Sequence, residues 1–68
     1  MRIRLNGEPV DLTDGATIAE AVAAAGANGD RRGIAVALEG EVVPRGQWED
    51  TTLREGQAVE VVRAIQGG

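Results

Sequence analysis

Two short runs near the N-terminus alternate polar and apolar residues, and an Asn-Gly pair separates them. The runs are residues 2–5 and 8–12, and such alternation is typical of strands with one buried face. Asn6-Gly7 is a strong signal for a hairpin, because both central residues of a type I′ turn need positive φ. Pro9 places the second strand at a sheet edge, since proline lacks a backbone donor. The side chains expected to face the core are Ile3, Leu5, Val10 and Leu12.

The next apolar residues follow a helical period. Thr17 and Glu20 have the spacing of a capping box, which predicts that the helix begins at Thr17. Gly26 is suited to the left-handed position that ends a helix. The spacing of the apolar residues predicts a stripe that faces the sheet. Its members are Ile18, Ala21, Val22 and Ala25.

The second half of the chain predicts three more strands. A loop covers 26–33, a strand covers 34–39, and a short strand over 41–43 is halted by Pro44. Residues 45–58 are expected to be irregular, with one short turn near Trp48, before a last strand from Ala58 to Ile65. The side chains expected to face the core are Ile34, Val36, Leu38, Val59 and Val61.

The order hairpin, helix, strand, short strand, long loop and last strand is the layout of a β-grasp fold. It predicts an α+β domain in which a mixed sheet of four to five strands packs on one α-helix, with the first and last strands parallel at its centre. We expect one domain over residues 1–65, followed by a flexible tail over 66–68, because a chain of 68 residues leaves no room for a second core.

Composition excludes most chemistry of the chain's own. Cys and His are absent, which rules out disulfides, zinc fingers and iron–sulfur clusters. Ser, Lys and Tyr are absent too, so neither a catalytic triad nor a Schiff-base lysine can form. The carboxylates do not follow a calcium-loop pattern. We therefore expect no enzyme activity, no metal and no bound cofactor.

Charge and hydropathy limit the partners and the cellular location expected for the protein. Eleven acidic residues against seven Arg give a net charge of −4, which disfavours nucleic-acid binding because phosphate backbones are anionic. No stretch approaches the about 20 apolar residues that cross a membrane. The strand-like pattern begins at once after Met1, with no signal-peptide core. We expect a cytoplasmic protein without a membrane partner.

The reactive group that remains is the terminal carboxylate of Gly68. The last strand is followed by Gln66-Gly67-Gly68, and two residues without side chains can enter a channel too narrow for others. Terminal glycines are also common in frayed chain ends, so the pair is weak evidence by itself. Combined with the predicted strand order, it indicates a tail, Ile65 to Gly68, that presents its carboxylate to a partner.

The outer face of the sheet is the expected partner surface. Strand alternation directs Ala35, Ala37 and Val62 away from the helix, and Val43 is expected to join them. Exposed small apolar residues suggest a docking contact, although isolated apolar residues are also ordinary on surfaces. Trp48 is expected to cover the end of the core rather than to bind a ligand, since one large ring can seal an aliphatic interior.

Two blocks of the sequence carry specific motifs: residues 35–48, with Val43-Pro44-Arg45 and Trp48, and residues 53–68, which end in Ala64-Ile65-Gln66-Gly67-Gly68. Both blocks resemble the ThiS family of sulfur carriers from thiamine biosynthesis, in the ubiquitin-like β-grasp superfamily. Residues 35–48 are similar to the family's strand–turn–strand signature, which ends in Val-Pro-Arg, one small residue, Gln or Glu, and Trp. Residues 53–68 are similar to the family's end, a turn and last strand that lead into an Ala-Ile-Gln-Gly-Gly tail. Gly46 and Gln57 depart from the commonest residues, and both lie in expected loops.

The resemblance implies a cycle in which partners do the chemistry. An adenylyltransferase related to ubiquitin-activating enzymes would use Mg-ATP to adenylate Gly68, and a cysteine-derived donor would supply sulfur to give a thiocarboxylate. Thiazole synthase would then take the sulfur into the thiazole ring of thiamine. A sulfur carrier for molybdopterin or cysteine synthesis, a ubiquitin-like modifier of lysines and a plain interaction domain remain alternatives.

Overall fold

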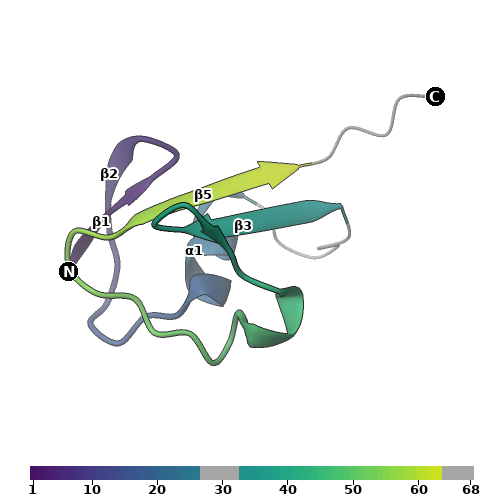
Figure 1. Cartoon of the computed structure of the whole chain (residues 1–68). Coiled ribbons are helices and arrows are strands. Elements are labelled where there is room, and N and C mark those ends of the chain that lie inside the picture. The colour runs from purple at the N-terminus through teal and green to yellow at the C-terminus, as the bar shows by residue number, and fades with distance from the viewer. Residues whose placement is uncertain (27–32, 64–68) are drawn as a thin grey trace.

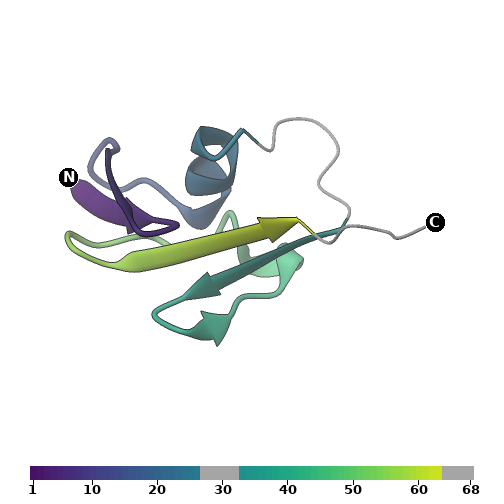
Figure 2. The ribbon, with the colours of Figure 1, turned by 90° about the horizontal axis from the view of Figure 1, so that it is seen from above.

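The computed structural model describes residues 1–26 and 33–63, which form one five-stranded sheet with a helix on one face (Figure 1). Turned by 90°, the same ribbon shows α1 lying along that face (Figure 2). The elements in chain order are β1 (Arg2–Leu5), β2 (Glu8–Asp11), α1 (Ile18–Ala24), β3 (Ile34–Leu38), β4 (Glu41–Val42), the 3₁₀ helix η1 (Arg45–Gln47) and β5 (Ala58–Arg63). The predicted α+β fold of β-grasp type is confirmed.

The sheet places the first and last strands together at its centre. The strand order is β2-β1-β5-β3-β4, with β1 and β5 parallel and the other neighbours antiparallel. Strand β5 is therefore bonded on both sides, to β1 and to β3. A strand in this position is held more firmly than an edge strand, because its backbone groups are paired in both directions. This central strand is the last one in the described part of the chain.

The N-terminal hairpin forms as its sequence predicts. Asn6 and Gly7 have φ values of 53° and 85°, which are the left-handed conformations of a type I′ turn. Strand β2 lies at the edge of the sheet, so Pro9 leaves no internal ladder bond unmade. A second two-residue turn, Glu39-Gly40, joins β3 to β4 with φ values of 50° and 85°.

Helix α1 begins and ends where the sequence predicts, but its buried stripe differs at one position. Glu20 Oε2 accepts a hydrogen bond from Thr17 N at 2.8 Å, as part of a capping box. Gly26 has a φ of 85°. The prediction that Ala25 faces the sheet is wrong: Ala25 is the exposed C-cap, and Ala19 is buried instead. The last helical residue is Ala24, so Ala25 lies at the exposed end of the helix, where the chain turns away through Gly26.

The core lies between the helix and one face of the sheet and is almost wholly aliphatic. Trp48 is the exception, with 1% of its surface exposed. Its indole Nε1 donates a hydrogen bond to Val43 O at 2.9 Å, so the polar atom of the ring is satisfied. The buried residues around it are Ile3, Leu5, Ile18, Ala19, Ala21, Val22, Ile34, Val36, Leu53 and Val59. Most of the predicted core is confirmed, with Trp48 inside it, although Ala25 is exposed. Four predicted core residues are only partly buried and pack against it: Val10, Leu12, Leu38 and Val61.

Two predictions concern residues outside the described ranges. The loop predicted over 26–33 falls mostly in the gap at 27–32, and the last strand is described only as far as Arg63. The boundary between a domain over 1–65 and a tail over 66–68 thus stays a prediction. No helix in the described part of the chain is long and apolar enough to cross a membrane.

Candidate functional site

Strand β5 is the last described element and precedes the C-terminal residues in the sequence. Its register runs opposite the whole of β3, and its last residue, Arg63, pairs with Ile34. Ile65, Gln66, Gly67 and Gly68, which the sequence predicts to form the reactive tail, lie outside the described residues. Their attachment point is therefore defined, because the strand that carries them is fixed by pairing on both sides.

An asparagine side chain extends the pairing of β5 toward the tail. Strand β1 ends at Leu5, yet Asn6 Oδ1 accepts a hydrogen bond from Val61 N at 2.8 Å. Asn6 Nδ2 donates to Val61 O at 3.3 Å, and Asn6 N donates to Val59 O at 2.9 Å. The side-chain amide of Asn6 thus makes the two hydrogen bonds to β5 that one more backbone residue of β1 would make. This Asn6–Val61 clamp holds β5 two residues before Arg63.

The start of β5 is held in a similar way by the β3–β4 turn. Glu39 N donates a hydrogen bond to Ala58 O at 2.9 Å, and the Glu39 carboxylate accepts one from Ala58 N. Since Glu39 occupies a left-handed φ of 50°, which is uncommon for a residue with a long side chain, these two bonds help to keep it there.

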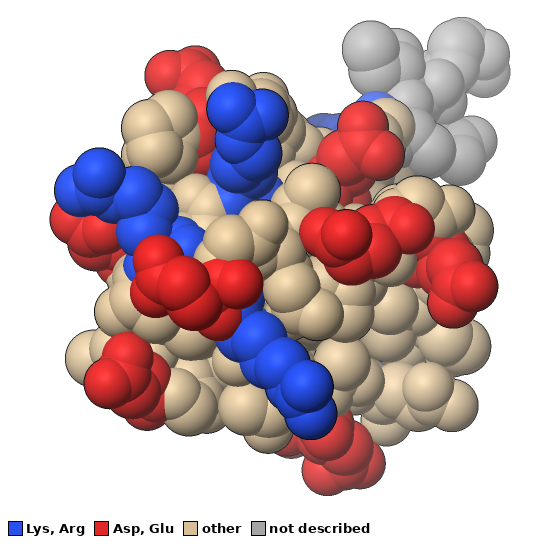
Figure 3. All heavy atoms as spheres, turned by 60° about the vertical axis from the view of Figure 1, so that its left-hand side comes forward, with Lys and Arg blue, Asp and Glu red and all other residues tan. Residues whose placement is uncertain are grey.

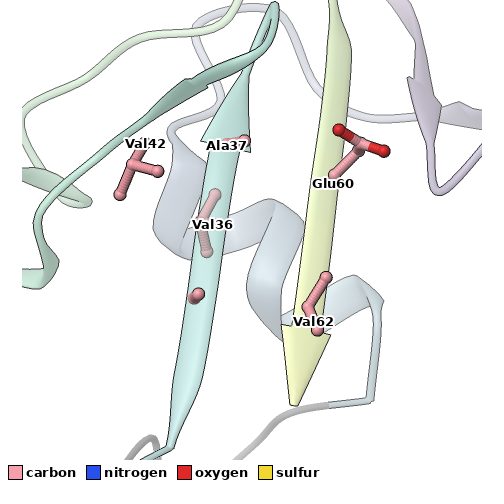
Figure 4. Close-up of a pocket in the computed structure, with 6 residues that line it drawn as sticks. Val36, Ala37, Val42, Glu60 and Val62 are labelled. Atoms are coloured by element: carbon pink, nitrogen blue, oxygen red, sulfur yellow. The ribbon is translucent and has the colours of Figure 1, made fainter. Parts of the chain in front are cut away.

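The face of the sheet opposite α1 carries a shallow apolar patch (Figure 4). We call it the outer patch, and it is lined by Ala35, Ala37, Val42, Glu60, Val62 and the backbone side of Val36. Ala35 lies directly opposite Val62, and Ala37 lies between Val42 and Glu60. The depression has a volume of about 340 Å³. Val42 and Val62 are 76% and 59% exposed, which is unusual for large aliphatic side chains.

Three of the four residues predicted to form the partner surface lie on the outer face of the sheet, and their role in binding a partner stays a prediction. Ala35, Ala37 and Val62 lie on the outer face, but the placement of Val43 there is wrong. Val43 is half-buried and packs against the core, while Val42 takes the outer position. The register decides this, because Val42 pairs with Ala37 and paired residues share a face.

Sequence reasoning missed Val42, Glu60 and Asn6 as parts of this region. Alternation along β5 could have placed Glu60 beside the apolar residues, since it lies two positions before Val62. For Val42 the sequence gave no signal, because Val42 and Val43 are adjacent and equally apolar. The contact between Asn6 and Val61 joins residues 55 positions apart, and no local pattern reports such a contact.

Charges on the described surface are mixed rather than gathered by sign, as on the face shown in Figure 3. Arg2 Nε contacts Asp11 Oδ1 at 2.9 Å. Their hydrogen bond, together with the attraction between the opposite charges, lowers the pKa of Asp11 and raises the pKa of Arg2. This pair lies at the opposite end of the sheet from Arg63, because β1 and β5 are parallel and Arg4 is level with Ala58. It therefore belongs to the hairpin and not to the outer patch.

The described residues contain no chemistry-bearing cluster beside the outer patch. No group of three or more His, Cys, Asp or Glu side chains in residues 1–26 and 33–63 is placed to hold a metal ion. No charged or polar side chain in these ranges is buried. The features that the arrangement offers are a surface for docking and a firmly held strand that leads to the C-terminal residues.

Comparison with known proteins agrees with this arrangement. The ThiS family profile matches residues 3–68. The sulfur carrier protein ThiS of Thermus thermophilus is 41% identical over 64 residues, which are 94% of this chain and 95% of that protein. A crystal structure of the thiamine biosynthesis protein ThiS from Geobacter metallireducens has a TM-score of 0.79 at 28% identity over the whole of both chains. A solution structure of a thiamine biosynthesis protein from that organism gives 0.78 at 31% identity, over all of this chain and 88% of that one. The chain therefore belongs to the ThiS family.

Proposed function

We propose that this protein is a sulfur carrier of thiamine biosynthesis, with the carboxylate of Gly68 as its working group. Membership of the ThiS family carries the proposal, and the sulfur carrier named among its relatives is similar over nearly its full length. The fold is consistent with it. The strand that leads to Gly68 is the central one, bonded on both sides, and the outer patch lies beside it.

The carrier needs an activating partner because of the chemistry of its tail. A terminal carboxyl group has a pKa of about 3.3–3.7 and is an anion at neutral pH, and an anionic carboxylate is a poor electrophile. In the proposed cycle a carboxylate oxygen of Gly68 attacks the α-phosphorus of Mg-ATP, and pyrophosphate leaves. The resulting acyl adenylate has AMP as a good leaving group. The partner, an adenylyltransferase related to ubiquitin-activating enzymes, binds the Mg-ATP and stabilises the developing charge.

Sulfur replaces AMP in the next step. A cysteine-derived donor delivers sulfur at the oxidation level of sulfide, which attacks the acyl carbon and displaces AMP. The product is a thiocarboxylate at Gly68, in which one oxygen of the original carboxylate has been exchanged for sulfur. Thiazole synthase then transfers the sulfur into the thiazole ring, and the carrier returns to the carboxylate. This chain performs none of the bond changes itself; it is recognised by its partners, which we place with it in the cytoplasm.

Intact mass spectrometry tests the proposal. The carrier is incubated with the purified activating enzyme of its source organism, Mg-ATP and a cysteine-fed sulfur donor, and we expect a species in which one oxygen has been replaced by sulfur. A variant with one Ala added after Gly68 is the matched control and should stay unmodified, because its terminal carboxylate is displaced by one residue. Absence of the sulfur-bearing species from the unaltered carrier would refute the proposal.

The thiamine assignment has its own test. Deletion of the gene should cause a growth requirement that the thiazole precursor relieves. Loss of molybdoenzyme activity with thiamine synthesis intact would instead assign the carrier to molybdopterin. Stable conjugates of higher mass that persist after denaturation would indicate a protein modifier.

A further inference from the structure

One carboxylate lies at the edge of the otherwise apolar outer patch. Glu60 lines the depression together with Val42 and Val62, and it lies directly opposite Ala37 on β3. Figure 4 shows Glu60 on β5 across from Ala37, with its carboxylate directed away from Ala37. The alanine methyl group is too small to shield a neighbouring charge, and Glu60 is exposed. The shallow apolar depression therefore has a negative charge at its edge.

No ion pair among the described residues involves this carboxylate, although Arg4 lies on the same face of the neighbouring strand β1, level with Ala58. The ion pairs within residues 1–26 and 33–63 join the N-terminal amine to Asp14 and Arg2 to Asp11, at the hairpin end of the sheet. The Glu60 carboxylate has neither a hydrogen bond nor an ion pair with any described residue. In the free protein its charge is solvated by water.

That solvation is lost when another protein covers the outer patch. Removing water from an unpaired carboxylate is more unfavourable than the burial of two exposed valine side chains is favourable. A purely apolar partner surface would therefore bind this patch poorly. A partner that places a cation against Glu60 avoids the penalty, and it gains a charge-assisted hydrogen bond in a water-poor contact.

We propose that Glu60 selects the activating partner by pairing with an arginine at the centre of the partner's contact surface. This inference rests on the proposed function, and it adds the chemistry by which the partner is chosen. Arginine fits better than lysine, because its planar guanidinium can form two parallel bonds with a carboxylate. Glu60 lies on the same strand that leads to Gly68, three residues before the strand ends at Arg63, so the pair also sets the position of the tail relative to the partner.

Kinetics of ATP–pyrophosphate exchange with the purified activating enzyme of the source organism test this inference. We expect Glu60→Gln to raise the KM for the carrier at least tenfold with kcat nearly unchanged, because the partner's arginine loses its counter-charge while the tail chemistry stays intact. Glu60→Arg should raise the KM further through repulsion of like charges, and Glu60→Asp should recover part of the affinity. Glu8→Gln is the matched control, since Glu8 is an exposed glutamate on edge strand β2, and its KM should equal that of the unaltered carrier.

The direction of the change in KM distinguishes this inference from the alternative that Glu60 only keeps the protein soluble. If Glu60 only keeps the sheet soluble, Glu60→Gln removes a desolvation penalty, and the KM falls or stays the same. Either result would overturn the inference while exchange with the unaltered carrier still supports the proposed function. Absence of exchange with the unaltered carrier would overturn both. Unfolding curves that coincide for Glu60→Gln and the unaltered carrier establish that a raised KM reflects binding and not loss of folded protein.

Discussion

The Asn6–Val61 clamp should make a large contribution to the stability of this domain. In Asn6→Ala, Val61 loses both partners of its backbone groups, at 2.8 and 3.3 Å, at about 0.5–1.5 kcal/mol for each bond. Alanine must also adopt the left-handed φ of 53°, at about 1–2 kcal/mol. The sum is about 2–5 kcal/mol. A chain of this length is stable by about 3–10 kcal/mol in total, so Asn6→Ala should leave a substantial unfolded fraction.

Two further substitutions at Asn6 separate the cost of the left-handed backbone from the cost of the lost side-chain hydrogen bonds. Asn6→Gly removes the same two bonds but tolerates the positive φ, so it should lose about 1–3 kcal/mol from the bonds, plus about 0.4–1 kcal/mol from the greater freedom of the unfolded chain. Asn6→Asp keeps an acceptor for Val61 N but sets a second oxygen against Val61 O. It should therefore lose one bond and add a repulsion. Glu8→Ala, on the other side of the turn, is the control and should change stability by less than about 0.5 kcal/mol.

Urea unfolding followed by the fluorescence of Trp48 measures these differences directly. Trp48 is the single aromatic residue of the chain and is 1% exposed, so its emission should shift to longer wavelength as the core opens. Hydrogen exchange gives a second readout, because the Val61 amide should exchange faster in Asn6→Gly than in the unaltered protein. Unchanged unfolding midpoints and unchanged exchange at Val61 in both Asn6→Ala and Asn6→Gly would refute the role of the clamp.

Three other predictions follow from the core, the hairpin and the outer patch. Trp48→Ala should lower the unfolding free energy by about 3–5 kcal/mol and unfold much of the protein, because it removes the largest fully buried side chain. Trp48→Phe should lower it less. Thermal unfolding followed by circular dichroism measures both effects, and an unchanged melting temperature in both variants would contradict the packing of Trp48. Arg2 lowers the pKa of Asp11, so the ion pair should stabilise the fold at pH values above the pKa of Asp in the unfolded state, and this stabilisation should be lost as the pH falls through the lowered pKa of the folded state. Asp11→Asn should remove that part of the pH dependence of stability. An NMR titration in which Asp11 has its ordinary pKa would contradict this prediction. Val62→Asp should change the unfolding free energy by about 0.5 kcal/mol or less, because Val62 is exposed, but it should prevent activation of the carrier by the partner. Full activation of this variant would argue against docking at the outer patch. Val62→Thr is the conservative control.

Much of the fold follows from local signals in the sequence. The Asn6-Gly7 turn, the capping pair Thr17 and Glu20, and the left-handed Gly26 each appear where the sequence predicts them. These features depend on the conformational preferences of one to four neighbouring residues, so tertiary contacts do not need to be known. Alternation along β3 and β5 likewise places the core side chains correctly, because a strand directs successive residues to opposite faces.

The candidate site could be predicted only in part. Alternation identifies Ala35, Ala37 and Val62 on the outer face, but it cannot choose between Val42 and Val43, since both are equally apolar and the strand is two residues long. The sequence also predicts the working group, Gly68, which lies outside the described residues and remains a proposal. Its assignment depends on the composition of the chain and on the family rather than on local geometry.

The sequence alone thus determined the hairpin, the helix and its caps, the identity of the core and the absence of catalytic side chains of the common nucleophilic types. The tertiary structure alone decided that Val42 faces outward, that Glu60 lies at the edge of the apolar patch and that Asn6 holds Val61. The physical reason is the range of the interaction. Turns, caps and alternation are set by residues close in the chain, whereas register and the contact across 55 positions exist only once the strands have paired.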